Sequence, residues 1–452
     1  MNDATIPPLN DASATRLPRS ALALVAGQGI SGLGSALTGF GLNVWVFRQT
    51  GSFGLFALLT VIANLPQVAF APIAGAIADR IDKRRLLIGC DIAAMAIVLA
   101  LLYAHSHGTL TVPLVAVSNL LLSACSVQRW SAIGPAISLL VPKGLLGRIN
   151  GLMQSFNGIR VMLGPMLGAL ALGALGLDSL FAFDALSYVP GLAILLLIGI
   201  PSSPAARSPG DARPRRRDEL TYGLRWIAAH APFRRMLVFF ALINIAISVY
   251  TVTFAPYVMS FASNRTLGTG MCMEGGGAVV MGLVLARLRL SGGEEARIIW
   301  GAFGVGAVMM AWGMLRAPAA IFGAALLLGA LFSIITSSSQ TLWQANVPIE
   351  HQGKVFAVRM AVAFGLTPLS VLGAVPLAQF VTAPALDRLP WAAHLWGTAQ
   401  AGPLGLMLSF LGLGVLLCAV MLRARGGLGF APCSTPAEPT RAAGAPAPAT
   451  GH

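Results

Sequence analysis

Residues 75–85 read GAIADRIDKRR, and they follow an uncharged stretch that runs from Phe53 to Ala74. Six of the seven positions from Asp79 to Arg85 carry charge. In the whole chain of 452 residues only 10% are charged and 56% are hydrophobic, whereas soluble domains carry about 25% charged residues. We therefore expect a membrane protein, in which this stretch ends one hydrophobic span and leads into the next.

Hydrophobic segments of spanning length recur along the chain. A helix crosses the bilayer with about 20 residues, and apolar runs with short breaks fall at 21–46, 53–77, 86–104, 112–138, 149–175, 179–200, 233–258, 267–286, 298–315, 317–341, 356–382 and 402–422. These runs predict an all-α protein with twelve transmembrane helices. The first 20 residues are polar and lack the pattern of a cleaved secretory signal, so we expect the first span to direct insertion itself.

Lysine and arginine are concentrated in alternate connections between the spans. Cytoplasmic loops of membrane proteins are enriched in these residues. With the N-terminus inside, most of the 30 lysines and arginines are cytoplasmic, Arg359 among them, and the outer loops hold only Arg48, Arg265, Arg316 and Arg388. We predict a multi-pass protein of a bacterial-type inner membrane with both termini in the cytoplasm. The excess of basic over acidic residues is consistent with contact with anionic lipid. No basic patch with interleaved aromatic residues indicates a nucleic-acid partner.

Two pairs of similar segments indicate an internal duplication. GAIADR at 75–80 pairs with GLVLAR at 282–287, an offset of 207, and VPKGLLGRI at 141–149 pairs with VPIEHQGKV at 347–355, an offset of 206. We therefore predict two six-helix halves, at 21–200 and 233–422. A cytoplasmic segment at 1–20, a basic cytoplasmic linker at 201–232 and a disordered tail at 423–452 complete the chain.

The opening stretch resembles the loop between the second and third helices of the major facilitator superfamily. The pattern G-x-x-x-D-R-x-G-R-R is matched by Gly75, Asp79, Arg80, Lys83 and Arg84, with Asp82 in place of its second glycine. The sequence around this loop is similar to that of the macrolide-efflux and enterobactin-exporter branch of the superfamily. The resemblance covers all twelve spans. It implies a monomeric secondary transporter with two pseudo-symmetric halves around a central cavity.

A second element is similar to the antiporter signature G-P-x-x-G-G of the same superfamily. GPMLGA at 164–169 matches it through Gly164, Pro165 and Gly168, while Ala169 replaces the last glycine and Arg160 stands where an earlier glycine is usual. The resemblance favours antiport.

The charged loop has a chemistry that suits a gate. Asp79, at the cytoplasmic end of a span, can accept hydrogen bonds from the amides of a neighbouring helix N-terminus, while Arg80 and Arg84 can reach carbonyl ends or phosphates. Such contacts form when the halves close on the cytoplasmic side. We predict a conformational latch at Gly75, Asp79, Arg80 and Arg84. The alternative is a plain positive-inside stop signal, which leaves Asp79 unexplained.

Polar residues at helical spacing mark faces of several spans. A path for substrate or protons is predicted at Gln28, Ser31, Asn64, Gln67, Asn157, Asn244 and Gln340. For a single Ser or Thr the alternative is a hydrogen bond to its own helix or to a neighbouring helix.

Charged residues inside the spans are costly and therefore informative. An arginine at mid-span costs about 2.5–3.5 kcal/mol on insertion scales, so Arg129 and Arg160 are expected to face a cavity or a partner. Asp91 lies close to Arg85 in sequence and Asp184 close to the predicted outer surface, so both are interpreted as structural.

Glu274 precedes three glycines, Gly275 to Gly277, which allow close helix approach. A carboxyl group in a desolvated position binds a proton more readily than in water. We predict that Glu274 couples protons or contacts substrate. The alternatives are an ion pair with a cavity arginine and simple exposure at the outer end.

The sequence argues against two other function classes. It contains no paired-carboxylate metal motif or His cluster for a membrane enzyme, and no G-x-x-x-x-G-K-[ST] loop for an ATP-driven pump. The prediction is a non-enzymatic, proton-coupled exporter of a small molecule, without cofactor or metal. Arg129 and Arg160 favour an anionic substrate such as a siderophore. The alternative is efflux of lipophilic cations of the macrolide or multidrug type.

Overall fold

The structure is a computed structural model that describes residues 16–50, 69–201, 216–288, 293–388, 390–397 and 401–430, with positions 59, 62, 65 and 66. In its first half the helices are α1 (Arg19–Thr50), α3 (Ala71–Arg80), α4 (Lys83–Ser106), α5 (Val112–Leu140), α6 (Leu146–Leu175) and α7 (Leu177–Leu197). Then follow α8 (Arg216–Ala229), α9 (Ala231–Met259), α10 (Asn264–Arg287), α11 (Glu294–Trp312), α12 (Pro318–Asn346), α13 (Ile349–Gly365), α14 (Thr367–Pro376), α15 (Ala383–Arg388), α16 (Pro390–Trp396) and α17 (Ala401–Ala424). The predicted all-α class is confirmed.

Ten of the described helices are long and apolar enough to cross a membrane. They correspond to ten of the twelve predicted spans. About half of the second predicted span, 53–77, lies outside the described residues, and the ninth corresponds to α11, whose first turn carries Glu294, Glu295 and Arg297.

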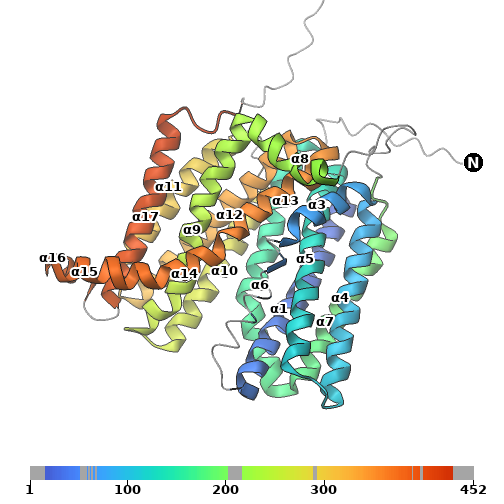
Figure 1. Ribbon diagram of the computed structural model, residues 1–452, viewed down its shortest axis with the longest axis horizontal. Coiled ribbons are helices and arrows are strands. Elements are labelled where there is room, and N and C mark those ends of the chain that lie inside the picture. Colours follow the sequence, from blue (N-terminus) through green and yellow to red (C-terminus); the bar gives the residue numbers. More distant parts are fainter. Residues whose placement is uncertain are drawn as a thin grey trace, which may run out of the picture.

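The helices form two bundles that lie side by side. Figure 1 shows α1 and α3 to α7 in one bundle and α9 to α12, α14 and α17 in the other, with α13 beside α3 and with α15 and α16 projecting from the second bundle. Each bundle has its own apolar core. In the second bundle the core contains the buried side chains of Tyr257, Trp312 and Trp343, and in the first it contains Phe181 and Tyr188.

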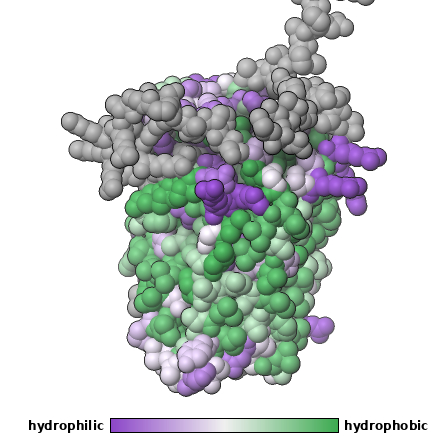
Figure 2. Space-filling view, turned by 90° about the vertical axis from the view of Figure 1, so that its right-hand side faces the viewer, coloured by the Kyte–Doolittle hydropathy of each residue, from purple (hydrophilic) through white to green (hydrophobic). Residues whose placement is uncertain are grey.

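One end of the molecule carries most of the charge, and we call it the basic end. Here α1 begins, α17 ends, and the chain passes from α3 to α4, from α5 to α6 and from α12 to α13; it is the upper end in Figure 1. Figure 2 shows a broad apolar belt below this end, as expected of a surface that faces lipid. Leu186 and Leu197 are among the exposed large apolar residues of the described chain.

Asp82 explains how the opening stretch folds. Its carboxylate accepts a hydrogen bond of 3.0 Å from the backbone N–H of Arg85 and so caps the N-terminus of α4. The residue that departs from the family pattern therefore has a local structural role.

The eleventh predicted span differs from the helix found there. The sequence predicted one helix at 356–382, whereas α13 begins at Ile349 and the helix is interrupted before α14 and again by a π-helical turn at Leu377–Thr382. Pro368 and Pro376 lie at these interruptions, where proline removes a backbone donor. The earlier start places Arg359 well inside a helix, although the sequence assigned it to the cytoplasmic charges.

Parts of the predicted linker and tail pack against the bundle. In the linker, α8 contacts α13 so closely that a Cβ on Gly223 would lie 2.4 Å from the carbonyl oxygen of Lys354. After α17, Glu295 accepts hydrogen bonds from the backbone amides of Leu428, Gly429 and Phe430. The predicted disordered tail therefore begins with an ordered segment up to Phe430, and its remainder lies outside the described residues.

Candidate functional site

One close contact between the halves is the seam between α6 and α10. A Cβ on Gly282 would lie 2.4 Å from Ser155 Oγ and 2.5 Å from the carbonyl oxygen of Gly151. Further along, a Cβ on Gly158 would lie 2.7 Å from the carbonyl oxygen of Gly275. Small residues on both helices thus bring the two backbones into contact, as in other membrane helix pairs.

A second seam joins α3 to α13. A Cβ on Gly75 would lie 2.4 Å from the Cβ of Ala357 and 2.6 Å from the carbonyl oxygen of Gly353. Under the internal repeat, Gly75 corresponds to Gly282 and Ala357 to Gly151. The duplicated sequence segments therefore form equivalent contacts between the halves.

Hydrogen bonds join the halves near the basic end. Arg148 Nε donates to the carbonyl oxygen of Ala286 at 2.7 Å, and Asn150 Nδ2 donates to Gln344 Oε1 at 2.8 Å. Gln344 Nε2 in turn donates to the carbonyl oxygen of Gly134 at 3.2 Å. The two halves are therefore closed against each other at this end.

The predicted latch is only partly described. Gly75 lies in the α3–α13 seam, and Asp79 follows it by one turn on the same face of α3, towards the N-terminus of α13. The side chains of Asp79 and Arg80 lie outside the described residues, so their latch role stays a prediction.

Arg84 requires a correction. Its guanidinium donates from Nε to the carbonyl oxygen of Leu195 at 2.7 Å and from Nη2 to that of Leu196 at 2.5 Å. It therefore binds carbonyl ends, as predicted, but they belong to α7 in the same half. These bonds do not depend on closure between the halves.

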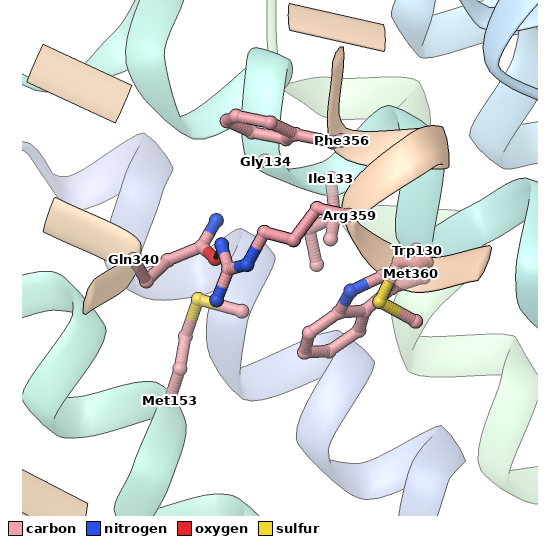
Figure 3. A pocket seen from close by; sticks show the side chains of 8 residues that line it. All are labelled: Trp130, Ile133, Gly134, Met153, Gln340, Phe356, Arg359 and Met360. Carbon is pink, nitrogen blue, oxygen red and sulfur yellow. Dashed lines mark hydrogen bonds between the residues drawn. The ribbon is translucent and has the colours of Figure 1, made fainter. Parts of the chain in front are cut away.

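A small pocket lies where α5 and α6 of the first half meet α12 and α13 of the second. Arg359 Nη1 donates to Gln340 Oε1 at 2.7 Å and Arg359 Nη2 to Ser339 Oγ at 3.3 Å. Figure 3 shows the guanidinium of Arg359 extending towards Gln340 in the middle of this pocket. The other lining residues are Trp130, Ile133, Gly134, Met153, Phe356 and Met360.

Arg359 is the main site residue that the sequence prediction missed. Within the described part of the chain it has no carboxylate partner, and it stacks over Trp343 with its guanidinium carbon 5.6 Å from the ring centre. A useful signal was present in the sequence, because Pro348 follows Asn346 and Val347 and suits a helix start near that position.

Arg160 lies further along the same face of α6 as the pocket residue Met153. The two are seven residues apart, which corresponds to about 10 Å along the helix. Arg160 is exposed, and its Nη2 donates to Asn157 Oδ1 at 2.8 Å. The predicted path residues Asn157, Arg160 and Gln340 are thus arranged along one region between the halves.

Arg129 has a partner inside its own half. Its Nη1 lies 3.4 Å from Asp91 Oδ1, and Gln28 Nε2 donates to Asp91 Oδ2 at 3.0 Å. The structural interpretation of Asp91 fits this ion pair. Gln28 belongs to this buried group between α1 and α4. Its assignment to an open path is therefore corrected.

Ser31 is also corrected, because it is fully buried between α1 and α7. Its hydroxyl donates to the carbonyl oxygens of Gly27 and Ser187, each at 3.1 Å. Ser31 therefore follows the alternative stated for a single Ser or Thr, in which the hydroxyl bonds to its own helix and to a neighbouring helix.

Glu274 lies in the second half, where Tyr250 donates a hydrogen bond of 3.2 Å to its Oε2. The glycines after it do allow close approach, since Gly275 packs on Met162 of α6 and Gly277 on the carbonyl of Leu326 in α12. Among the described residues its partner is a tyrosine and not an arginine, so the ion-pair alternative is not found.

The remaining predicted residues lie in three kinds of place. Asn64 and Gln67 lie outside the described residues. Asn244 is half-buried on α9. Gly164 and Gly168 pack α6 against Ala36 and Phe40 of α1, so the antiporter-like element with Pro165 forms a helix contact within the first half.

Comparison with known proteins places these features in one family. Residues 24–370 match the sequence model of the Major Facilitator Superfamily. Macrolide efflux protein A of Streptococcus pyogenes is 26% identical over 176 residues, which are 39% of this chain and 44% of that protein. The match thus covers less than half the length of this relative. The multidrug efflux pump Tap of Mycobacterium bovis (strain BCG / Pasteur 1173P2) is 22% identical over 345 residues, 74% of this chain and 80% of the pump.

Solved structures share the fold. The human organic anion transporter MFSD10 (TETRAN) superposes with a TM-score of 0.66 at 15% identity, covering 89% of this chain and 100% of that one. A bacterial homologue of the iron transporter ferroportin in the outward-facing state gives a TM-score of 0.64 at 16% identity, covering 90% and 99%. The chain therefore belongs to the Major Facilitator Superfamily, whose membrane transporters have twelve helices in two halves.

Proposed function

We propose that this chain exports a small organic anion in exchange for protons, by alternating access, with its basic end at the cytoplasmic face of the membrane. The observation that carries the proposal is the placement of Arg359 and Arg160 along the region between the halves, each without a carboxylate partner among the described residues.

The orientation rests on charge. Lys83, Arg148 and Arg297 lie at the basic end, and cytoplasmic segments are enriched in such residues. Closure of both seams at this end then corresponds to an outward-facing conformation. Export as the direction is supported by the efflux relatives.

The substrate class follows from the arginines. A guanidinium presents five N–H donors in a planar fork that suits carboxylates and similar anions. Arg359 uses two of its nitrogens on Gln340 and Ser339, which hold the fork in the pocket. When the basic end opens, the guanidinium of Arg359 becomes accessible from the cytoplasm. Arg160 provides a second positive charge, about 10 Å along α6 from the pocket residue Met153. A siderophore that carries carboxylates, catecholates or hydroxamates fits this arrangement.

Proton coupling is assigned to Glu274. Its carboxyl group lies in the second half beside Tyr250, away from the described ion pair of the first half. The carboxyl group can bind a proton from the outside and release it after the halves rearrange. The flux of protons then returns the transporter to its starting conformation.

The test uses full-length protein in proteoliposomes with an imposed pH gradient. Arg359→Gln should lower transport of a catecholate siderophore by about tenfold or more, because a lost hydrogen bond to a charged group costs about 1.5–3 kcal/mol. Arg359→Lys should recover part of the loss, and Arg85→Gln, at an exposed position of the basic end, is the matched control. Wild-type siderophore transport in Arg359→Gln and Arg160→Gln would refute the anion site.

A second candidate is efflux of macrolides or other lipophilic drugs, which the two efflux relatives favour. A deletion strain decides between them. The anion proposal expects a siderophore to accumulate inside the cells under iron starvation. Normal siderophore secretion together with new sensitivity to macrolides would establish the drug exporter instead.

A further inference from the structure

Asp184 is buried in the first half, although the sequence placed it near the outer surface. It lies seven residues into α7, about 10 Å along the helix, and is 1% exposed. The carboxyl group packs directly on the backbone of α1, where a Cβ on Gly34 would lie 2.9 Å from Asp184 Oδ1. A glycine at this position of α1 is what admits the carboxyl group.

The carboxyl group of Asp184 is poorly satisfied as an anion. Oδ1 accepts one long hydrogen bond, 3.4 Å from Ser35 Oγ, and the Ser35 hydroxyl also lies 2.9 Å from the hydroxyl of Tyr188. Oδ2 is buried and has no hydrogen-bond partner within the described part of the chain. The hydroxyl of Thr38, from the same face of α1, is likewise buried without a partner there.

The charged and titratable groups near Asp184 come from four helices. Arg129 of α5 and Tyr188 of α7 interact with Asp184 itself, and Cys90 and Asp91 of α4, Cys125 of α5 and Arg160 of α6 lie around Arg129. Arg129 forms its ion pair with Asp91 and has its guanidinium carbon 5.6 Å from the ring centre of Tyr188. Arg160 donates to Asn157 instead. Among the described residues Arg129 thus forms its ion pair with Asp91 and not with Asp184.

Asp184 has no cation of its own among the described residues, because Arg129 forms its ion pair with Asp91 and Arg160 donates to Asn157. An ionised carboxylate that is buried without a cation costs several kcal/mol, whereas the protonated form is neutral and gains an O–H donor for a buried acceptor such as the Thr38 hydroxyl. We propose that Asp184 is a second proton-binding site of the transporter, separate from Glu274 and located in the other half. This inference rests on the proposed proton exchange.

The site exchanges its proton with water. In the conformation described here the α1–α7 contact excludes solvent from Asp184, and the carboxyl group retains its proton. When α1 moves with the rearrangement of the halves, water reaches the carboxyl group, the O–H bond breaks, and the proton leaves as a hydrated proton. With one proton-binding site in each half, the transporter can carry two protons in each transport cycle.

The test measures protonated carboxyl groups directly, by the C=O stretch in infrared difference spectra of the lipid-reconstituted full-length protein across a pH step. Asp184→Asn should remove one component and Glu274→Gln another. Asp178→Asn is the matched control, since Asp178 begins the same helix and its side chain is 48% exposed. Ser35→Ala retains Asp184 and should shift the frequency of the Asp184 component, which tests the assignment even if Asp184→Asn fails to fold.

The outcomes separate this inference from the proposed function. Loss of one component in Asp184→Asn supports the site, even if the wild-type protein transports no organic anion. An unchanged spectrum in Asp184→Asn and no frequency shift in Ser35→Ala would overturn it, while leaving anion export intact. A transport measurement tests whether Asp184 has more than a structural role. Asp184→Asn should lose pH-driven transport and keep substrate exchange without a gradient.

Discussion

Gly282→Ala should open the basic end. The added Cβ would lie 2.4 Å from Ser155 Oγ and 2.5 Å from the carbonyl oxygen of Gly151, whereas ordinary contacts begin at 3.4 Å, so α6 and α10 must separate by about 1 Å. Overpacking of this kind costs about 1–3 kcal/mol. Since the seam joins the two halves, the cost applies to the conformer closed at the basic end. A change of 1–3 kcal/mol shifts a two-state equilibrium by about 5- to 150-fold.

The control is Gly276→Ala on the same helix. A Cβ there meets nothing within 4 Å, and both substitutions gain about the same 1 kcal/mol of helix propensity. Spin labels at positions 143 and 350, which are exposed at the basic end of opposite halves, report the separation in a variant that lacks the native cysteines. Gly282→Ala should populate a longer distance and Gly276→Ala should match the wild type. Identical distance distributions in all three proteins would refute the reasoning.

Three further substitutions test separate parts of the mechanism. Asp79→Asn keeps the shape and removes the charge, so the protein should insert and fold but transport slowly; wild-type rates in vesicles would contradict the latch. Glu274→Gln mimics the protonated acid and should lose pH-driven transport while exchange without a gradient persists; an unchanged response to the pH gradient would exclude it as a required coupling residue. Arg84→Ala removes bonds within one half and should lower the thermal unfolding temperature without changing the label distance; a longer distance would restore its role as a latch.

The sequence predicted the helices well because their signal is local. Runs of about 20 apolar residues follow from the thickness of the bilayer, and the repeat offset between Gly75 and Gly282 indicated the two halves. The sequence did not predict the two seams in which these glycines lie, because their partners in α6 and α13 required the structure. Helix boundaries near proline were less certain, which is why Arg359, close to the predicted start of the span at 356, was counted with the cytoplasmic charges.

The site was harder to predict, because the spacing of polar residues defines a helix face without its neighbour. Ser31 and Gln28 belong to a periodic stripe on α1, yet this stripe faces α7 and α4 within the bundle. Arg129 and Asp91 are far apart in sequence, so their pairing depends on the packing of α4 and α5. Asp184 was misplaced for a similar reason, since its depth depends on the glycine opposite it.

The two seams have a consequence for how such a chain can arise. The contact of α3 with α13 and that of α10 with α6 are related by the repeat, so each half contributes one helix of each kind. This is the arrangement of an isologous interface, in which two copies of one surface complement each other. A six-helix precursor with these glycines would carry everything needed to pair with a second copy of itself, and gene fusion would then have joined an existing homodimer.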